Sequence, residues 1–356
     1  KLMLKYKVID HSGGRKIHKG LKVNVGGLVI FVSFLVSYIV ALPYLSNNCN
    51  IDSAITFILV LTCIIVVGVR DDMNSLTAKN KLVLEIIAIL FLCRMGILID
   101  NLYGFLGIYE LPLWLSYVVT IFFFVVIINT YNLIDGIDGQ AVTQALIILI
   151  PLFIFFLILG NNNSEIVFHN PNFWTIICIG IVGALVSFLY YNWEPSKIFM
   201  GDTGSIFIGT IIASAMVCAI NFNGHNHNDF NLFGFEIKSK IGIVVTLFYI
   251  PLADTLRVFC ARILKKKSPF TPDKSHIHHF LLRTGASHKT STLITLTFSI
   301  IISTLGLIFS VIFTDNIFIP LMVVLFILYV ISVSYITKRR LELMKKKLRC
   351  QKKLTQ

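Results

Sequence analysis

Residues 112 to 160 read PLWLSYVVTIFFFVVIINTYNLIDGIDGQAVTQALIILIPLFIFFLILG, and this stretch decides the fold class. Two apolar runs, 112–130 and 141–160, flank a short polar segment. Each run supplies about the 20 apolar residues that an α-helix needs to cross the hydrocarbon core of a bilayer. The stretch therefore predicts two membrane-spanning helices joined by a turn that is rich in carboxylates and amides.

The rest of the chain repeats this pattern. Of its 356 residues, 56% are hydrophobic and only 14% are charged, and the mean hydropathy is +0.82, which is untypical of water-soluble domains. We predict an all-α, polytopic membrane protein with a single transmembrane domain over residues 1–356. Ten spans are expected, at 24–45, 51–69, 82–99, 112–130, 141–160, 173–191, 204–221, 241–258, 291–314 and 317–337.

Basic residues are distributed unevenly between the two sides that these spans define. All but three of the 31 Lys and Arg residues lie in the segments 1–23, 70–81, 192–203, 257–290 and 338–356. Because Lys and Arg are retained on the cytoplasmic side during insertion, these segments are expected to face the cytoplasm. The formal charge of +13 then indicates contact with anionic membrane lipids, and no nucleic-acid partner is expected.

Four polar clusters lie at the predicted cytoplasmic ends of the spans, where acidic residues are costly and often functional. The first is the pair Asp71 and Asp72, which follows the span 51–69 and precedes Lys79 and Lys81. Two adjacent carboxylates suit a metal ion or a general base, because their repulsion raises the pKa of one of them. The alternative is a solvated turn at a helix end.

The second cluster contains Asn129, Asn132, Asp135 and Asp138, at the end of the span 112–130. These residues recur at every third position, so any helical part of the segment places them on one face. Amides beside carboxylates suit a uridine base, a ribose and phosphate-bound Mg²⁺. The alternative is a Gly-rich turn between two helices.

The third cluster is the segment FMGDTGS, from Phe199 to Ser205, which leads into the span 204–221. A carboxylate between glycines at the start of a helix is typical of sites where backbone N–H groups and a cation meet a phosphate. The alternative is that Asp202 serves only as an N-cap.

The fourth cluster lies in and before the predicted cytoplasmic loop 259–290. Its polar side chains include Asp254, Arg257, His276, His278 and His279. Three histidines beside basic residues are interpreted as contacts for substrate phosphates; zinc binding and a plain basic surface loop are the alternatives. A basic tail, 338–356, follows the last span and is expected to hold it at the headgroups.

Carboxylates, glycine turns, Lys and His on one membrane face favour Mg²⁺-assisted phosphoryl transfer, in which positioning and charge neutralisation supply most of the catalysis. Asp202 and the pair Asp71 and Asp72 are the candidate oxygen ligands, since Mg²⁺ takes one or two carboxylates with phosphates and water. Mn²⁺ is the alternative ion.

These motifs resemble, in order, those of the polyprenyl-phosphate N-acetylhexosamine-1-phosphate transferases of glycosyltransferase family 4. The resemblance covers almost the whole chain. Its motifs are Arg15-Lys-Ile-His18 with Gly26-Gly27, Asp71-Asp72, Asn129 to Gly139, Phe199 to Ser205, and His276-Ile-His278-His279. The last motif is similar to the branch that uses UDP-N-acetylglucosamine, whereas the phospho-MurNAc-pentapeptide transferases carry three consecutive histidines and remain the alternative.

The resemblance implies transfer of N-acetylhexosamine 1-phosphate from a UDP-sugar to undecaprenyl phosphate, with release of UMP, at the cytoplasmic face of a bacterial inner membrane. It also implies an additional N-terminal span, which would give eleven, and a second copy of the chain is a further candidate partner. Gln140 stands where the family has an apolar residue, and this departure affects sugar preference more than the type of reaction.

The resemblance also implies individual roles. Asp202 would ligate Mg²⁺, Asp71 would deprotonate or position the lipid phosphate, and Asp72 would support Asp71. The expected catalytic residues that close the site over the sugar phosphates are His276, His278 and His279. The expected substrate-binding residues are Lys81 for the pyrophosphate, Asn132, Asp135 and Asp138 for uridine, and Asn129, Phe199, Arg15 and His18.

Three other classes fit less well. CDP-alcohol phosphotransferases also use Asp-Gly motifs, but no acidic residue follows Asp138 before Glu165. Aspartate-rich prenyltransferases do not explain Asp202 or the histidines. A transporter is expected to have ionisable residues near mid-membrane and an internal repeat, whereas here the acids gather at one membrane edge.

Overall fold

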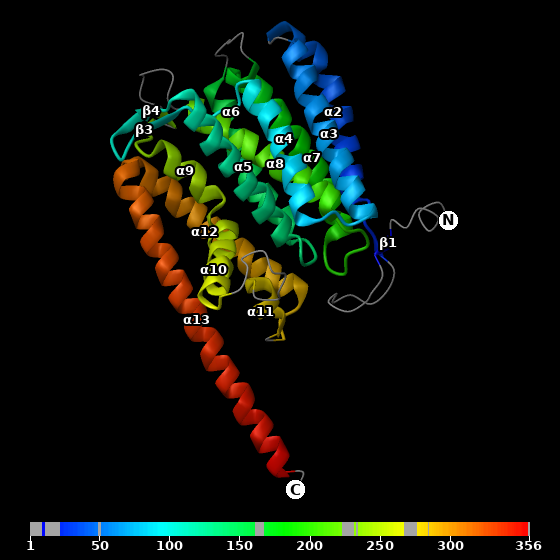
Figure 1. Cartoon of the computed structure of the whole chain (residues 1–356), viewed down its shortest axis with the longest axis vertical. Coiled ribbons are helices and arrows are strands. Elements are labelled where there is room, and N and C mark those ends of the chain that lie inside the picture. The colour runs from blue at the N-terminus through cyan, green and yellow to red at the C-terminus, as the bar shows by residue number, and fades with distance from the viewer. Residues whose placement is uncertain are drawn as a thin grey trace.

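Long apolar helices make up most of the computed structural model (Figure 1). It describes residues 9–10, 22–48, 51–160, 167–222, 231–232, 234–266, 276–283 and 285–354. The long helices are α2 (Gly26–Asn48), α3 (Ile51–Met73), α4 (Ala78–Arg94), α5 (Leu113–Ile134), α6 (Gln140–Leu159), α7 (Pro171–Asn192), α8 (Gly201–Phe222), α10 (Tyr249–Leu264), α12 (His288–Ile312) and α13 (Asp315–Leu354). The short ones are η1 (Val167–His169), α9 (Lys240–Leu247) and α11 (Ile277–Arg283).

Eight of the described helices have the length and hydropathy to cross a membrane, or nine if α9 and α10 form one broken span. The chain is therefore a multi-pass membrane protein. The span predicted at 82–99 corresponds to α4, which has only 17 residues and ends at Arg94. At 1.5 Å per residue α4 is about 26 Å long, shorter than a hydrocarbon core of roughly 30 Å. The count of ten spans thus remains a prediction.

Helix α8 occupies the centre of the bundle. All of its residues from Thr203 to Asn221 are buried, and it packs against α2, α3, α5 and α6. In lipid, small residues at helix contacts let backbones approach closely and replace hydrophobic driving force with close packing. The first turn of α8, which contains Asp202, is therefore held by several helices at once.

Helices α2 and α8 approach closely where Gly27 of α2 lies against Gly204 of α8. The backbone N–H of Gly27 donates to the carbonyl of Met200 at 2.9 Å. A Cβ atom added at Gly27 would lie 2.2 Å from the backbone nitrogen of Gly204, a distance that no rotation of a side chain can relieve. The start of α2 is thus fixed directly beside the start of α8.

Gly27→Ala is expected to lower the stability of the folded protein by about 3 kcal/mol, because two backbones would have to move apart. Thermal unfolding in detergent would measure the change. Gly183→Ala on α7 is the matched control: an added Cβ there meets no atom within 4 Å, so stability should change by no more than about 1 kcal/mol. Equal melting temperatures for the two variants would contradict the prediction.

The span predicted at 241–258 is divided in the structure into two helices. Helix α9 ends at Leu247, α10 begins at Tyr249, and the two are bent by 77°. Pro251 lies in the first turn of α10 and lacks the N–H that would continue the helical hydrogen bonds to Leu247. The break places α10 beside α11, the helix that carries two of the three predicted histidines (Figure 1).

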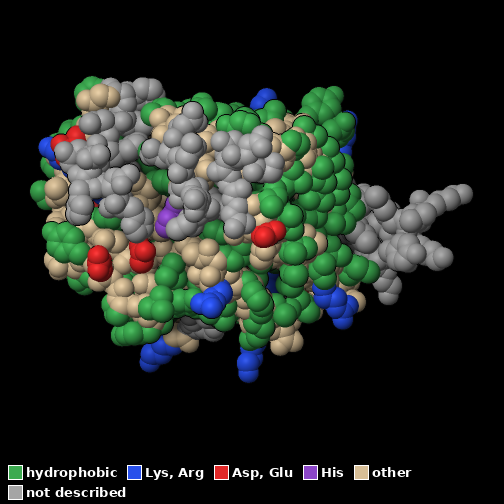
Figure 2. All heavy atoms as spheres, turned by 90° about the horizontal axis from the view of Figure 1, so that it is seen from above, with side chains coloured by type: hydrophobic (Ala, Val, Ile, Leu, Met, Phe, Trp, Pro, Cys, Tyr) green, Lys and Arg blue, Asp and Glu red, His purple; other side chains and the backbone are tan. Residues whose placement is uncertain are grey.

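Three short antiparallel ladders lie in the connections and were not predicted. They are β1 (Ile9–Asp10) with β2 (Lys22–Val23), β3 (Asn101–Phe105) with β4 (Ile108–Glu110), and β5 (Asn231–Leu232) with β6 (Phe235–Glu236). Asn316 ties the β3–β4 hairpin to α13 by bonding Leu106 and Gly104. Among the described residues on the face shown in Figure 2, hydrophobic side chains dominate and charged side chains are few and scattered.

Candidate active site

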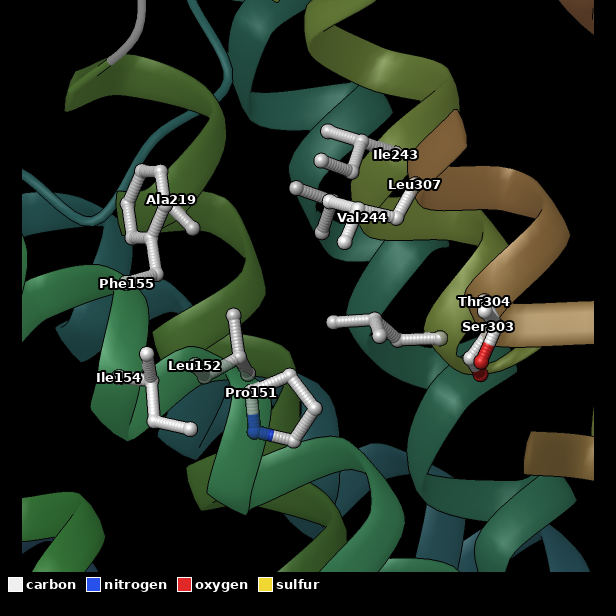
Figure 3. A pocket seen from close by; sticks show the side chains of 11 residues that line it. Pro151, Leu152, Ile154, Phe155, Ala219, Ile243, Val244, Ser303, Thr304 and Leu307 are labelled. Carbon is white, nitrogen blue, oxygen red and sulfur yellow. The ribbon is translucent and has the colours of Figure 1, made fainter. Parts of the chain in front are cut away.

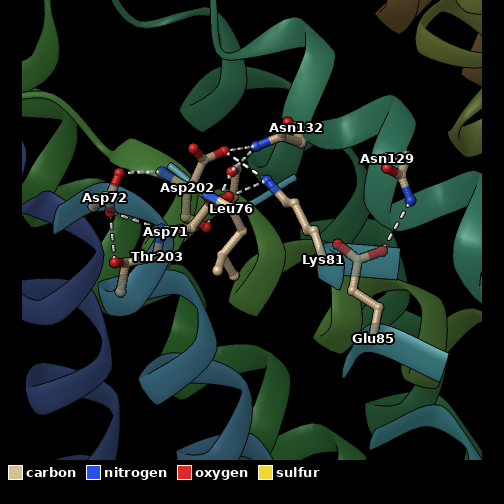
Figure 4. Close-up of polar contacts among 10 residues, drawn as sticks. Asp71, Asp72, Leu76, Lys81, Glu85, Asn129, Asn132, Asp202 and Thr203 are labelled. Atoms are coloured by element: carbon tan, nitrogen blue, oxygen red, sulfur yellow. Dashed lines mark hydrogen bonds and ion pairs between the residues drawn. The ribbon is translucent and has the colours of Figure 1, made fainter. Parts of the chain in front are cut away.

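The ends of four helices meet at the end of the bundle from which α13 projects (Figures 1 and 4). Asp71 and Asp72 end α3, Lys81 lies in the first turn of α4, Asn132 lies in the last turn of α5, and Asp202 begins α8. Their polar atoms are joined in one hydrogen-bonded network. The structure thus brings together members of three clusters, the first and last of which lie 130 positions apart in the sequence.

Lys81 joins two of the predicted carboxylates. Its Nζ lies 2.9 Å from Asp71 Oδ2 and 2.9 Å from Asp202 Oδ1, and its side chain is only 14% exposed. The Asn132 amide donates to the same Asp202 oxygen and to Ser205 Oγ. Lys81 is thus a positive charge held in a fixed position among carboxylates at a membrane edge, where it can contact a phosphate.

Asp72 has a different task from Asp71. Its Oδ1 accepts from the backbone N–H of Asp202 at 2.9 Å, and its Oδ2 accepts from the backbone N–H and the hydroxyl of Thr203 at 3.0 and 2.6 Å. A carboxylate that binds the first N–H groups of a helix satisfies orphan donors and opposes the positive end of the helix dipole. Asp72 therefore fixes the position of α8 and of Asp202.

Gly201 makes this arrangement possible. Its backbone has a φ of 74°, which an L side chain rarely adopts, and an added Cβ would lie 2.7 Å from Asp72 Oδ2. Only glycine tolerates both the left-handed conformation and the close carboxylate.

The residues fit a divalent cation that also binds substrate. Among the described residues, none hydrogen-bonds to Asp202 Oδ2, and the Asp202 side chain is 36% exposed. Burial, together with the negative charges of Asp202 and Asp72, raises the pKa of Asp135 to about 7. This excess of negative charge is what a cation would neutralise.

The described part of the chain contains no group of three or more His, Cys, Asp or Glu side chains that could hold a metal by themselves. Mg²⁺ is compatible with such a sparse donor set, because substrate phosphates and water complete its six oxygen ligands. The site thus offers Asp202 as a protein ligand and leaves the other positions to the substrate.

Asp138 points away from this network. Its Oδ2 accepts from the backbone N–H of Ser196 at 3.1 Å, its Oδ1 lies 3.5 Å from His288 Nδ1, and its carbonyl accepts from Thr292. These contacts tie the Asp-Gly turn to the start of α12. The structure therefore does not place Asp138 with Asp202, although both belong to the predicted site.

Glu85 is a site residue that the sequence reasoning missed. It is 4% exposed, its Oε2 accepts from the Asn129 amide at 3.0 Å, and its buried Oε1 has no partner among the described residues. Glu85 lies one helical turn from Lys81 on α4, just as Asn129 lies one turn from Asn132 on α5. The available signal was an acid within an apolar helix, four residues after a lysine.

The histidine segment reaches the second cluster through His278. A Cβ added at Gly136 would lie 2.8 Å from His278 Nε2, so this ring rests directly on the Asp135-Gly136 turn. The His276 and His278 rings stack with centroids 5.7 Å apart. Burial, helped by the neighbouring His279 and His276, lowers the pKa of His278 to about 3, so His278 is neutral at physiological pH.

Three predicted substrate-binding residues remain: Phe199, Arg15 and His18. Phe199 is partly buried, and its carbonyl accepts from the backbone N–H of Gly26 at 2.9 Å. Arg15 and His18 lie outside the described residues.

An apolar cavity of about 330 Å³ lies among α6, α8, α9 and α12 (Figure 3). Ser303 and Thr304 are its polar lining residues. The apolar ones are Pro151, Leu152, Ile154, Phe155, Ala219, Ile243, Val244, Leu247 and Leu307. None of the predicted site residues lines this cavity, and we assign it no part in the chemistry.

Sequence comparisons relate the chain to known proteins. The family model described as glycosyl transferase family 4 matches residues 54–220. A decaprenyl-phosphate N-acetylglucosaminephosphotransferase of Mycobacterium leprae is 32% identical over 77% of this chain and 70% of its own length. A probable undecaprenyl-phosphate N-acetylglucosaminyl 1-phosphate transferase of Bacillus subtilis is 29% identical, covering 87% and 78%. An undecaprenyl-phosphate alpha-N-acetylglucosaminyl 1-phosphate transferase of Escherichia coli K12 is 26% identical, covering 95% and 86%.

Proposed function

The chain belongs to glycosyl transferase family 4, and we propose that it transfers N-acetylglucosamine 1-phosphate from UDP-N-acetylglucosamine to undecaprenyl phosphate. An oxygen of the lipid phosphate bonds to the phosphorus that carries the sugar, and the bond from that phosphorus to the UMP oxygen breaks. The names of the three relatives support both the transferred group and the polyprenyl acceptor. The lipid-linked product would start a cell-envelope polysaccharide.

The observation that carries the proposal is Lys81, held 2.9 Å from both Asp71 and Asp202. An ammonium fixed in this way offers its charge to the pyrophosphate of the nucleotide sugar. Phosphoryl transfer depends mainly on positioning and on neutralising the charge of the transferred group. We therefore assign pyrophosphate binding to Lys81.

Asp202 is the residue that would hold Mg²⁺, with Mn²⁺ as the alternative ion, through the oxygen that Lys81 and Asn132 leave unbound. The ion would supply charge neutralisation at the pyrophosphate. Asp72 keeps Asp202 in place through the first turn of α8.

Asp71 is better suited to positioning than to removing a proton. Its Oδ1 accepts from the backbone N–H of Leu76 at 2.7 Å and its Oδ2 contacts Lys81. A phosphate monoester has a second pKa of about 6, so the lipid phosphate is already largely a dianion at neutral pH. Asp71 thus holds Lys81 in place, and the lipid phosphate needs no base to act as the nucleophile.

The uridine pocket is assigned to the turn that follows α5. Asn132 and Asp135 lie within the network around Asp202, whereas Asp138 holds the turn against α12. The roles of Asp138, Asn129 and Phe199 in substrate binding remain predictions. The histidines would close the site over the sugar phosphates, with neutral His278 acting as a hydrogen-bonding group and not as a cation.

The cytoplasmic position of this face, in a bacterial inner membrane, is also part of the proposal. It rests on the distribution of Lys and Arg residues and on the location of a soluble nucleotide-sugar donor. The metal, the site residues and the ten predicted spans belong to the same proposal.

Purified protein, supplied with UDP-N-acetylglucosamine, undecaprenyl phosphate and Mg²⁺, is expected to release UMP and to form the sugar-diphosphate lipid detected by mass spectrometry. Removal of the divalent ion with EDTA should stop the reaction, and added Mg²⁺ should restore it. Parallel assays with UDP-N-acetylgalactosamine and UDP-MurNAc-pentapeptide would establish which sugar is accepted. Failure to release UMP from any UDP-hexosamine would rule out the proposed activity.

A further inference from the structure

Asp254 is a buried carboxylate on α10 that binds groups from its own helix and from two other parts of the fold. Its Oδ2 lies 3.0 Å from His276 Nδ1, and both of its oxygens accept from the backbone N–H of Ile277. Its Oδ1 also accepts from Arg257 Nη2 at 2.7 Å and from the Tyr329 hydroxyl of α13 at 3.3 Å. Asp254 therefore joins α10, the start of α11 and α13.

The arrangement determines which nitrogen of His276 carries a proton. Asp254 pairs with the Arg257 guanidinium, so its carboxylate is ionised and can only accept hydrogen bonds. His276 Nδ1 must then be the donor. The remaining nitrogen, Nε2, is buried and has no partner among the described residues, in a side chain that is only 5% exposed.

His276 is also close to the reaction site. Its ring stacks on His278, and His278 rests on the Asp135-Gly136 turn. An unpartnered imidazole nitrogen in this place is costly unless a ligand binds it. The phosphates of the nucleotide sugar are the groups at this site to which Nε2–H of a protonated His276 ring could donate.

We propose that Asp254 is a positioning residue of the transferase: it fixes the orientation and the protonation pattern of His276 so that Nε2 alone is available to a phosphate oxygen of the substrate. When His276 is protonated, the carboxylate stabilises the imidazolium and Nε2–H donates to the phosphate, with no bond formed or broken at His276. Arg257 and Tyr329 keep Asp254 in place. This inference rests on the proposed function.

The test is Asp254→Asn, which preserves the shape of the side chain. The asparagine oxygen can still accept from the Ile277 N–H, but its amide must donate to His276 Nδ1, which moves the ring proton to Nε2 and removes the charge beside the ring. Loss of such a supporting group is expected to lower kcat by about 10- to 100-fold. The KM for UDP-N-acetylglucosamine should change by no more than about 3-fold, because no substrate-binding group is removed.

Asp315→Asn is the matched control. Asp315 is also buried, and it caps α9 by accepting from the Ser239 hydroxyl and from backbone N–H groups of Lys240, Ile241 and Gly242, far from the histidines in the fold. It should lower the melting temperature but leave the kcat of the folded, monodisperse protein within about 2-fold of the unmodified enzyme. A kcat for Asp254→Asn that matches this control would overturn the proposal.

A second measurement is independent of turnover. In protein labelled with ¹⁵N-histidine, the His276 resonances, assigned by their loss in His276→Gln, should show a protonated Nδ1 in the unmodified chain and an unprotonated Nδ1 in Asp254→Asn. An unprotonated Nδ1 in the unmodified chain would overturn the inference. If the unmodified protein released no UMP while Nδ1 was protonated, the proposed function would fail and the Asp254 contact would stand.

Discussion

Asp202→Asn is expected to lower the turnover number by at least about 1,000-fold, which corresponds to about 4 kcal/mol of transition-state stabilisation. The change removes the negative charge that would hold the divalent cation and that pairs with Lys81. It preserves the backbone N–H that Asp72 binds, so the start of α8 should keep its position. The measurement is UMP release by the purified variant at saturating substrate.

Asp52→Asn is the control for Asp202→Asn. Asp52 is also an aspartate in the first turn of a long membrane helix, but it is exposed and lies at the opposite end of α3 from Asp71. Its replacement should leave turnover within about 2-fold. Near-normal activity of Asp202→Asn, in protein that elutes and melts like the unmodified chain, would show that the metal is held elsewhere.

Lys81→Met is expected to have the second largest effect, because it acts on both catalysis and stability. The methionine fills a similar volume but leaves Asp71 and Asp202 without the ammonium that lies 2.9 Å from each. Removing one partner of a buried ion pair exposes the other to an uncompensated desolvation cost of about 3 kcal/mol. Loss of the charge that meets the pyrophosphate should also reduce kcat/KM by about 100-fold or more.

Lys79→Met separates these effects from a general loss of positive charge. Lys79 lies in the same first turn of α4 but is exposed, so its replacement should change neither the melting temperature nor kcat/KM appreciably. If Lys81→Met and Lys79→Met behaved alike in thermal unfolding and in UMP release, the central role of Lys81 would be excluded.

The positions of the apolar helices could be predicted from the composition of each segment. Each predicted span coincides with a helix or, at 241–258, with two. The structure departs from the simple pattern for local reasons: Pro251 lies where the region 241–258 divides into α9 and α10, and α4 is shorter than the length predicted at 82–99. The short β-ladders escaped prediction because residues in the connections pair over only two to five positions.

The sequence predicted which residues form the site but not which contacts each of them makes. Asp71, Asp72, Lys81, Asn132 and Asp202 were all named from the sequence, and the structure joins them in one network. Their separate tasks could not be assigned in advance, because a motif gives the type of a side chain and not the direction in which it points. Glu85 was overlooked since its partner, Asn129, lies on another helix.

Hydropathy and charge are properties of single segments. They determine whether a segment is stable in the hydrocarbon core of a bilayer, whatever the rest of the chain does. Sequence by itself therefore predicted where the long apolar helices of this chain lie and that its carboxylates, amides and histidines gather at helix ends. Tertiary structure alone decided that Asp72 caps α8, that Asp138 turns to α12 and that Asp254 holds His276. These contacts depend on how each helix is rotated and how closely it approaches its neighbours, which is set by packing between residues far apart in the chain, such as Gly27 against Gly204.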